Sequence, residues 1–498
     1  MTYRQQARKS LYWVAMAQVA SKALGFLRSL LLYNWLARSL LGLVGMADLV
    51  LNALLLFQEL GFSSALIYRK DRTDEAAGVT FWIVMGTSLV LYLIVVLGAY
   101  PLVALITSDP GTIGTVVGIL RVLALTIPLS GLSLVQLVLM TKELDFRRRV
   151  IPEVLSAAVN LTVVILLASR GRGVWSIVYG RLAECITLGI LVWSISRWRP
   201  RLRFNRAVAW EMFNYARHIV GSQVLIFFIT NIDNAFISRF LGTYALGGYD
   251  AAYTLANRPA TEITRLFGQV MFPAFSKVRD DVVELRAFFL RTTRYIAYIS
   301  IPLSVCIAVF ADKFLTFAYG SKFLDIIWPL RILTIYGLLR SVAANMGGIL
   351  KAGGKPNWLF NIAAARLAVM AALLYPATVR YGILGVSVLS AAVSIVDFAV
   401  STWLVNRIVQ ARMLDYVSML LPPFLIAVAA GAAANALYPH LAFLKGFIAL
   451  PLGGGIMLGL YGVVLWLVAP EARQLVEGLY NDIKQRGRLM LRPRGELG

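Results

Sequence analysis

The chain has little charge for its length. Of its 498 residues, 15% are charged, whereas a soluble domain usually carries about a quarter charged residues. Hydrophobic residues make up 59% of the chain, and no polar linker separates two cores. A soluble chain of this size would divide into several cores joined by polar segments. The composition therefore excludes a mainly water-soluble protein and predicts that lipid surrounds most of the chain.

Residues that bind metals or form disulfides are also scarce. The two cysteines, Cys185 and Cys306, lie in apolar runs and outside any CxxC pair, and the two histidines are His218 and His440. The ATP-binding pattern GxxxxGK[ST] is absent, since AGGKP at 352–356 lacks the following Ser or Thr. We therefore expect no disulfide framework, no metal centre, no cofactor and no ATP site.

Long apolar runs fill most of the chain. A helix needs roughly 20 mostly apolar residues to cross a bilayer, and short turn signals separate windows of that size. The runs are too long and too uniformly apolar for the strands of a membrane barrel. We predict an all-α polytopic membrane protein with about fourteen transmembrane helices, at residues 11–36, 43–67, 79–106, 114–140, 151–169, 174–196, 210–238, 245–275, 288–311, 326–350, 357–377, 382–405, 415–438 and 442–468.

Acidic residues are few beside basic ones. Lys and Arg number 48, Asp and Glu 25, and the formal net charge is +23. If the N-terminus lies in the cytoplasm, most Lys and Arg between the predicted helices fall on that side, including the arginines at 147–149. This asymmetry predicts cytoplasmic N- and C-termini. It also attributes the positive charge to contact with membrane lipids rather than with nucleic acid.

A smaller set of basic residues falls inside the predicted helices. A charge at the bilayer centre costs at least ~2.5–3.5 kcal/mol on insertion scales, so several such charges facing lipid are untenable together. We predict that they line a shared, water-filled cavity that binds a negatively charged group, because a guanidinium matches phosphate oxygens. The basic candidates are Lys22, Arg28, Arg121, Arg258, Arg265, Arg331, Arg340 and Arg366.

The acidic residues inside predicted helices are fewer, and each has two interpretations. Arg258, Glu262 and Arg265 are spaced i, i+4, i+7, which places them on one face of a helix. Glu262 is then either a structural ion-pair partner or a group that couples transport to H⁺ or Na⁺. The same two roles stay open for the other candidates, which are Asp48, Glu59, Asp233 and Asp397.

The two halves of the chain resemble each other. ARSLLGLVGMA at 37 parallels SRFLGTYALGG at 238, and LRVLAL at 120 parallels LRILTI at 330, an offset of about 200 residues. The offset spans six predicted helices, so both halves have the same orientation in the membrane, as in transporters built from parallel repeats. We expect a six-helix bundle at 1–206, a second at 207–410, two extra helices at 411–470 and a basic cytoplasmic tail at 471–498.

Several glycine-anchored segments resemble a known family. SLLLYNWLARSLLGLVGMADLV with LGFSSALIYRKD, ISRFLGTYALGGYDAAYTLANRP with VMFPAFSKV, and ILKAGGKPNW are similar to segments of the Wzx-type polysaccharide transporters. These belong to the multidrug/oligosaccharidyl-lipid/polysaccharide superfamily, and the resemblance covers about residues 10–410. It implies a two-bundle transporter fold that flips an undecaprenyl-pyrophosphate-linked oligosaccharide across the bacterial inner membrane for capsule, exopolysaccharide or O-antigen synthesis.

The resemblance also has implications for residues and partners. Lys22, Arg28, Arg258 and Arg265 fall on the two helices whose arginines lie in the cavity of related lipid II flippases. A polysaccharide polymerase and chain-length proteins are the implied partners.

Two other functions stay open. A drug or cation antiporter of the same superfamily would need an excess of acidic residues in its helices, whereas this chain has an excess of arginine there. A membrane polysaccharide polymerase or ligase would need a large outer loop, and the longest predicted outer loop has only about 14 residues, near 312–325.

Overall fold

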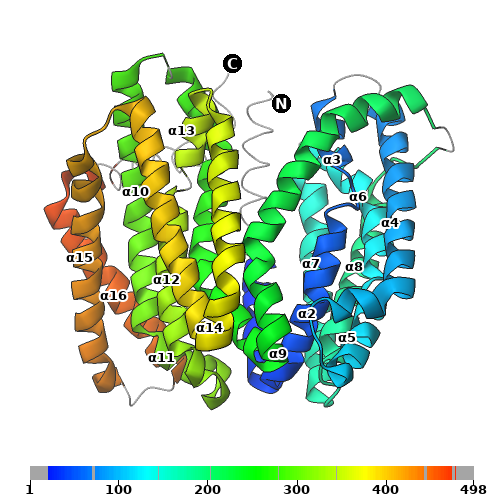
Figure 1. Cartoon of the computed structure of the whole chain (residues 1–498), viewed down its shortest axis with the longest axis horizontal. Coiled ribbons are helices and arrows are strands. Elements are labelled where there is room, and N and C mark those ends of the chain that lie inside the picture. Colours follow the sequence, from blue (N-terminus) through cyan, green and yellow to red (C-terminus); the bar gives the residue numbers. More distant parts are fainter. Residues whose placement is uncertain are drawn as a thin grey trace, which may run out of the picture. The chain divides into compact units, whose positions relative to one another are not determined.

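The computed structural model describes residues 21–69, 73–143, 145–201, 204–278, 280–343, 345–441, 446–473 and 477. Within these ranges the chain consists of α-helices with short 3-10 and π turns, and it contains no strand (Figure 1). The predicted all-α fold is therefore confirmed.

Eleven helical segments of the described part are long and apolar enough to cross a membrane. Two of these segments contain a glycine in the left-handed region, Gly242 (φ 79°) and Gly382 (φ 59°), where the chain turns. Each of the two segments therefore supplies two crossings, and a further helix occupies residues 21–35. The prediction of about fourteen transmembrane helices is in keeping with this count.

The outer faces of the helices are apolar. On α4 (Thr73–Ala104), the side chains of Leu89, Leu93 and Leu97 are 54%, 47% and 80% exposed. Their spacing of four residues places them in one stripe along the helix. Exposing such a stripe to water would cost about 25 cal/mol per Å² of apolar surface, whereas hydrocarbon solvates it without that cost. The chain is a multi-pass membrane protein.

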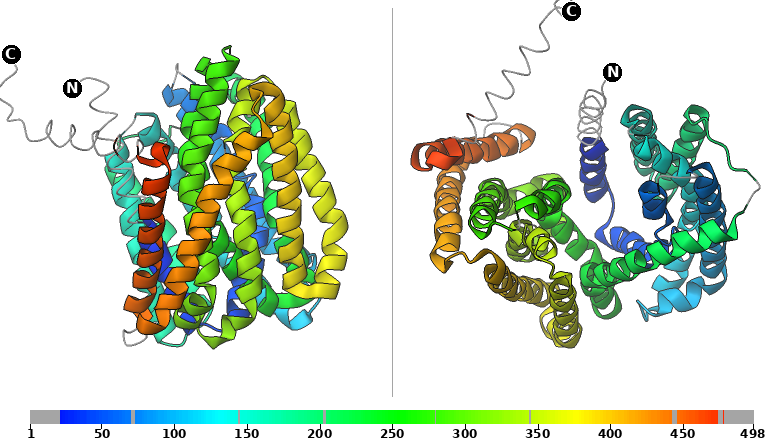
Figure 2. Two further views of the ribbon diagram at one scale, coloured as in Figure 1. Left: turned by 90° about the vertical axis from the view of Figure 1, so that its left-hand side faces the viewer. Right: turned by 90° about the horizontal axis from the view of Figure 1, so that it is seen from above.

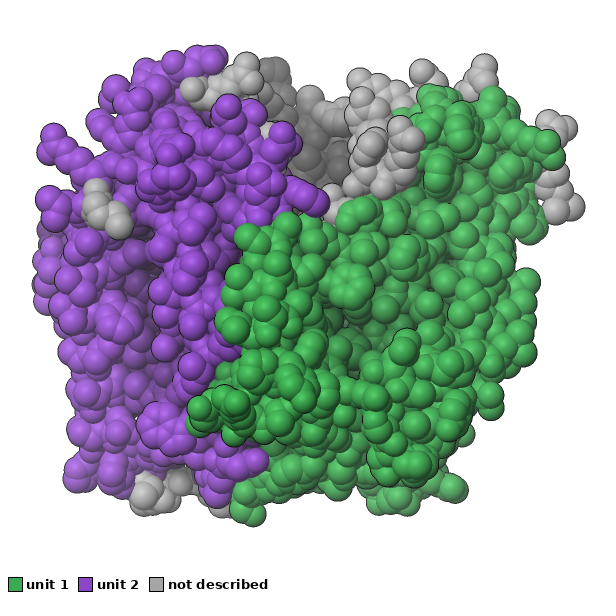
Figure 3. All heavy atoms as spheres, viewed as in Figure 1, with its two compact units in different colours: residues 1–251, 318–323, 363–386 green, residues 252–317, 324–362, 387–498 purple. Residues whose placement is uncertain are grey.

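The chain forms two compact units, which Figure 3 colours separately. Unit 1 comprises residues 1–251, 318–323 and 363–386, and unit 2 comprises residues 252–317, 324–362 and 387–498. The first boundary between these units falls at 251, within α9 (Arg206–Val278), which has residues in both units. The predicted six-helix bundles are defined by the sequence repeat, whereas the two units are defined by contacts between residues. The bundles stay a prediction.

Unit 1 is a bundle in which α7 packs on α8, α4 on α6, α6 on α8 and α2 on α5. Small and branched side chains of α3, α4 and α6 form one core with the start of α9, including Leu66, Val79, Val135 and Met212. Besides α4 and the first part of α9, its main helices are α2 (Arg38–Leu55), α3 (Phe62–Tyr68), α5 (Pro110–Leu123), α6 (Thr126–Lys142), α7 (Phe146–Ser169) and α8 (Trp175–Ile195).

Unit 2 is organised around α10 (Val282–Val309), on which α12, α15 and α16 pack (Figure 1 and Figure 2). The hydroxyl of Tyr461 on α16 donates to the carbonyl of Tyr298 on α10 at 3.1 Å. The extra helices of the sequence are thus part of this unit. Its other elements are α11 (Ala311–Phe314), η1 (Leu315–Tyr319), η2 (Ser321–Ile326), α12 (Ile327–Ala343), α13 (Met346–Ala352), α14 (Pro356–Val409), α15 (Met413–Leu437), η3 (Tyr438–Leu441) and α16 (Gly446–Val468), of which η1, η2 and α14 also contribute residues to unit 1.

The two matched repeat segments near residues 37 and 238 pack against each other in unit 1. A Cβ atom on Gly42 would collide with the backbone of Thr243, and one on Gly248 would collide with the guanidinium of Arg38. Arg38 is 2% exposed, and its guanidinium lies 4.1 Å from the ring centroid of Tyr244. The glycines of these motifs therefore permit a close helix crossing around a buried arginine.

Candidate functional site

An ion pair joins α2 to α8 inside unit 1. Arg181 donates to both carboxylate oxygens of Asp48, with an Nη2–Oδ2 distance of 2.7 Å, and the two side chains are 29% and 23% exposed. This geometry is strong because the guanidinium fork matches the carboxylate. The structure thus places Asp48 in a salt bridge, and its coupling role stays a prediction.

A second polar contact joins the helix at 21–35 to α7 and α8. Nη1 of Arg28 donates to Oδ1 of Asn160 at 3.2 Å, and Nδ2 of Asn160 donates to Oε2 of Glu184 at 2.6 Å. Asn160 is 1% exposed. Two consecutive hydrogen bonds therefore link a guanidinium to a carboxylate through a buried amide.

The sequence positions this contact through one helix pair. α7 and α8 are joined by a short turn at 170–174 and pack along each other, so Asn160 and Glu184 face one another. Arg181 and Glu184 are three residues apart on α8, so their side chains are neighbours on the surface of the helix. A single helix thus carries both the partner of Asp48 and the partner of Asn160.

A cavity of about 360 Å³ opens beside Arg28. Leucine, alanine and glycine residues complete its wall, and six of its ten lining residues are charged or polar. Polar groups at membrane depth are tolerated where they line a wet cavity. The charged and polar lining residues are Ser21, Arg28, Glu153, Ser156, Asn160 and Glu184.

Asp233 and Arg366 form a separate polar group in unit 1. Asp233 is 4% exposed and accepts a hydrogen bond from the Tyr249 hydroxyl at 2.6 Å. Arg366, on α14, is half-buried and close enough for its charge to act on Asp233. Neither residue lines the cavity beside Arg28.

The remaining candidates of unit 1 are scattered. Lys22 is half-buried and lies six residues before Arg28 on the same helix. Arg121 is exposed and donates from Nε to the carbonyl of Val96 at 3.1 Å, and Glu59 accepts from the Ser63 hydroxyl. Because Val96 lies on α4, this hydrogen bond of Arg121 connects α5 to α4.

In unit 2, Arg258 and Glu262 are half-buried within the second part of α9, one turn apart as the spacing predicts. The backbone of Arg265 is helical, but its side chain lies outside the described residues. Arg340 on α12 and Asp397 on α14 are also half-buried.

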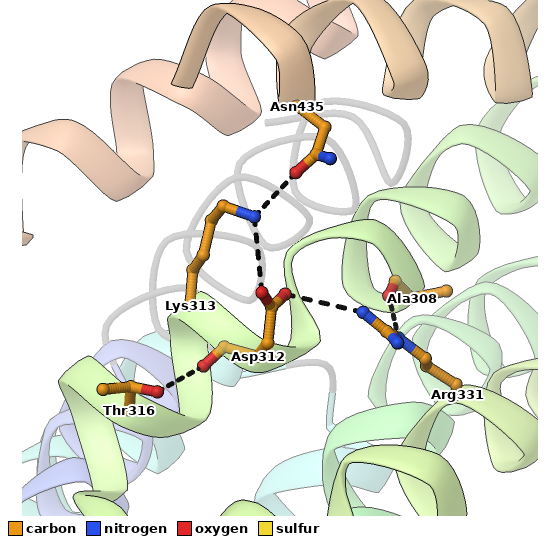
Figure 4. A network of polar contacts seen from close by, with 6 residues as sticks. All are labelled: Ala308, Asp312, Lys313, Thr316, Arg331 and Asn435. Carbon is orange, nitrogen blue, oxygen red and sulfur yellow. Dashed lines mark hydrogen bonds and ion pairs between the residues drawn. The ribbon is translucent and has the colours of Figure 1, made fainter. Parts of the chain in front are cut away.

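Arg331 lies in a polar network at the end of α12 (Figure 4). Its Nε donates to the carbonyl of Ala308 at 3.0 Å, its Nη2 lies 3.6 Å from Oδ1 of Asp312, and its guanidinium is 5.3 Å from the Trp328 ring centroid. Lys313 extends the network, because its Nζ donates to Oδ1 of Asn435 on α15 at 2.6 Å. These contacts join α10, α11, α12 and α15 within unit 2.

Two other cavities fit the predicted chemistry less well. One of about 410 Å³ in unit 2 is lined mainly by apolar groups such as Ile301, Leu338 and Phe424. Another of about 630 Å³ in unit 1 lies at helix ends, with Asp74 and Glu143 opposite arginines of the segment 195–201. Among the described residues, no group of three or more His, Cys, Asp or Glu could hold a metal ion.

The structure adds three residues to the surroundings of one candidate, Arg28. Arg28 meets Asn160 and Glu184, while Asp233, Arg121 and Arg331 each have separate partners. The sequence argument missed Glu153, Asn160 and Glu184. An acid three residues after Arg181 in an apolar run was the available signal for Glu184. A shared chamber formed by both units stays a prediction.

Comparisons with known proteins give the family. The family described as "Polysaccharide biosynthesis protein" matches residues 35–328. The chain is 26% identical over 383 residues to the teichuronic acid biosynthesis protein TuaB of Bacillus subtilis, covering 76% of this chain and 77% of TuaB. It is 24% identical to the lipopolysaccharide biosynthesis protein WzxC of Escherichia coli, covering 72% and 73%.

Solved structures give the fold. The lipid II flippase MurJ in an inward closed conformation is similar with a TM-score of 0.66 and 14% identity, over 93% of this chain and 99% of MurJ. An inward-facing multidrug resistance MATE family transporter of the MOP superfamily is similar with a TM-score of 0.64 and 17% identity, over 77% and 95%. The two-bundle transporter fold implied by the sequence is confirmed. Because the family match spans more than half of its length, the chain belongs to the polysaccharide biosynthesis protein family.

Proposed function

We propose that the chain is a flippase that moves an undecaprenyl-pyrophosphate-linked oligosaccharide from the cytoplasmic to the outer leaflet. Family membership and relatives named for teichuronic acid and lipopolysaccharide biosynthesis support a role in polysaccharide export. The likeness to a lipid II flippase is a likeness of fold. It supports a path large enough for a lipid-linked sugar.

The observation that carries the proposal is the placement of Arg28. Its guanidinium lines a partly polar cavity between membrane-length helices and donates a hydrogen bond to the amide of Asn160. A cation at this depth is costly unless it serves a polar ligand or a partner. A guanidinium binds two phosphate oxygens at once, and the contact strengthens where water is scarce. A pyrophosphate group is the ligand that this chemistry favours.

Transport in this proposal follows alternating access. The sugar-pyrophosphate head enters a cavity open to the cytoplasm, and the lipid tail stays in the bilayer. Basic residues contact the pyrophosphate, and the cavity then opens to the outer side. We assign this role to Lys22, Arg28, Arg258, Arg265, Arg340 and Arg366. Arg121 and Arg331, which contact neighbouring carbonyls, are given a structural role instead.

A cation or drug antiporter is the second candidate, because a MATE family transporter has a similar fold. Such a protein needs carboxylates that can meet a cation. Here Asp48 binds Arg181, Asp233 accepts from Tyr249, and Glu184 accepts from Asn160. These contacts favour the anionic substrate.

The setting of the protein completes the proposal. We place it in the inner membrane of a bacterium with both termini in the cytoplasm, since the basic loops favour that side. A polysaccharide polymerase and chain-length proteins would act on the product. A gradient of H⁺ or Na⁺ would supply energy, and the candidate coupling groups are Asp48, Glu59, Asp233, Glu262 and Asp397.

Two assays test the proposal. A strain lacking the gene is complemented with the wild-type chain, Arg28→Ala or a matched control, Arg239→Ala. Arg239 is exposed and donates to the carbonyl of Ala104 at 3.1 Å. We expect surface polysaccharide from the wild type and the control but not from Arg28→Ala. In proteoliposomes the purified chain should move a polyprenyl-pyrophosphate-linked oligosaccharide, and movement of a cationic dye instead would favour the antiporter.

A further inference from the structure

We propose that Glu184 and Asn160 are positioning residues that hold the Arg28 guanidinium in place for a pyrophosphate group. The inference rests on the proposed function, because it assigns a purpose to the neighbours of Arg28. Neither residue needs to touch the substrate, since both act through Arg28.

The chemistry of the three groups fixes the direction of the Asn160 amide. An ionised carboxylate only accepts hydrogen bonds, and a guanidinium only donates them. Glu184 therefore requires the NH₂ end of Asn160, which leaves the carbonyl end for Arg28. The distances of 2.6 Å to Glu184 and 3.2 Å from Arg28 match this arrangement. Because Asn160 is 1% exposed, water has little access to the amide and does not compensate for a wrong orientation.

Glu184 fixes this orientation from the α8 side, as Arg28 does from the other. A glutamine in its place could either donate or accept, so the contact at position 184 would allow both orientations of the Asn160 amide, and only Arg28 would still favour one of them. In the wrong orientation, the NH₂ group of Asn160 would face the donors of Arg28. The guanidinium would then lose a fixed partner and occupy several positions. A pre-organised group binds more tightly because less ordering remains to be done on binding.

The same cavity offers a matched control. Glu153 also lines it, but its carboxylate pairs with Arg149 one turn earlier on α7, at an Nε–Oε1 distance of 2.8 Å. Glu153→Gln removes the same charge at the same cavity as Glu184→Gln. It leaves the Asn160 amide and its two contacts in place. A general effect of cavity charge would change both variants alike.

The test measures binding of a short-chain polyprenyl pyrophosphate without sugar to the purified full-length chain in detergent. We expect Glu184→Gln and Asn160→Ala to raise Kd about tenfold, the size of one lost charge-assisted hydrogen bond. Glu153→Gln should not raise Kd, because removal of a negative charge from the cavity wall does not weaken the binding of an anion. Equal weakening by Glu153→Gln and Glu184→Gln would overturn the positioning role, as would an unchanged Kd for Glu184→Gln.

A double-mutant cycle separates positioning from a merely structural role. If Glu184 acts through Arg28, adding Glu184→Gln to Arg28→Gln should change Kd no further. A persistent tenfold effect without Arg28 would contradict the inference. Binding by Arg28→Gln as tight as that of the wild type, or no binding by the wild type, would instead refute the proposed function and the inference with it. Thermal unfolding of each variant checks that the fold is intact.

Discussion

Arg28 in unit 1 and Arg331 in unit 2 are both arginines inside apolar segments, yet their surroundings differ. Arg28 donates to the neutral amide of Asn160 beside a hydrophilic cavity. Arg331 donates to the carbonyl of Ala308 and lies near the carboxylate of Asp312 and the face of Trp328. The first arrangement keeps a cation next to a space for a ligand, and the second uses it to fasten helices. An arginine in a membrane helix therefore does not identify a binding site until its neighbours are known.

The largest expected effect contrasts these two arginines directly. Arg28→Ala should lower the initial rate of lipid-linked oligosaccharide translocation in proteoliposomes by about 10- to 100-fold, because a charge-assisted contact contributes about 1.5–3 kcal/mol. Arg331→Ala should retain at least about half of the wild-type rate, since its contacts lie within unit 2. If both variants lose the same fraction of the initial translocation rate, at equal amounts of reconstituted protein, the two arginines do not have different roles.

Stability should show the next effect, at the salt bridge of unit 1. Asp48→Ala removes the carboxylate that binds the half-buried Arg181 in a bidentate ion pair. This change should lower the free energy of unfolding by about 1–3 kcal/mol. The double variant Asp48→Ala/Arg181→Ala should recover part of that loss, because no charge is left unpaired. Thermal unfolding in detergent checks both. A double variant less stable than either single one would show that the two residues do not act as a pair.

A smaller loss of stability is expected at the network of unit 2. Asp312 is 44% exposed and its ion pair with Arg331 spans 3.6 Å, so Asp312→Ala should cost only about 0–1 kcal/mol. Added salt should reduce the difference from the wild type, since screening weakens exposed pairs. A loss of stability as large as that of Asp48→Ala would mean that the polar network around Arg331 contributes more than its geometry indicates.

The smallest effect concerns pH and a carboxylate in the loop before α5. The hydroxyl and the backbone N–H of Thr112 donate to Asp109 and hold its pKa below the ordinary value of 3.8. Because the folded-state pKa is the lower one, this group stabilises the fold above that value, and the contribution is lost as the pH falls through the folded-state pKa. The melting temperature of the wild type should therefore exceed that of Asp109→Asn at neutral pH and match it in strong acid. A constant difference would exclude ionisation as the cause.

Much of the fold could be predicted because bilayer thickness sets one length for every crossing. Apolar runs of that length located the helices, and the offset between the repeat motifs near 37 and 238 anticipated two related halves. The predicted breaks at 239–244 and 378–381 fall at or beside Gly242 and Gly382, where the structure has a turn at a glycine with a positive φ.

The candidate site was predicted only in part. Arg28 stands out as a cation in an apolar run, but the run does not tell which helix faces it. Glu184 was missed: it follows Arg181 by three residues on one helix, whereas the residue that donates a hydrogen bond to it is Asn160 on α7. Arg331 looked equivalent to Arg28 in the sequence, because its contact with Asp312 on α11 forms only when the chain folds. Such contacts depend on tertiary packing and leave no local pattern.

The central claim is that Arg28 faces a wet hollow that admits a pyrophosphate. Its direct test is thiol labelling of Ala157→Cys, a position lining that cavity, in a chain whose Cys185 and Cys306 are replaced by alanine. Leu97→Cys, on the apolar outer face, is the control. A membrane-impermeant, water-soluble thiol reagent applied to the purified chain in lipid nanodiscs should modify Ala157→Cys and not Leu97→Cys, and short-chain polyprenyl pyrophosphate should slow the reaction. Failure to label Ala157→Cys, or labelling that the pyrophosphate leaves unchanged, would contradict the account.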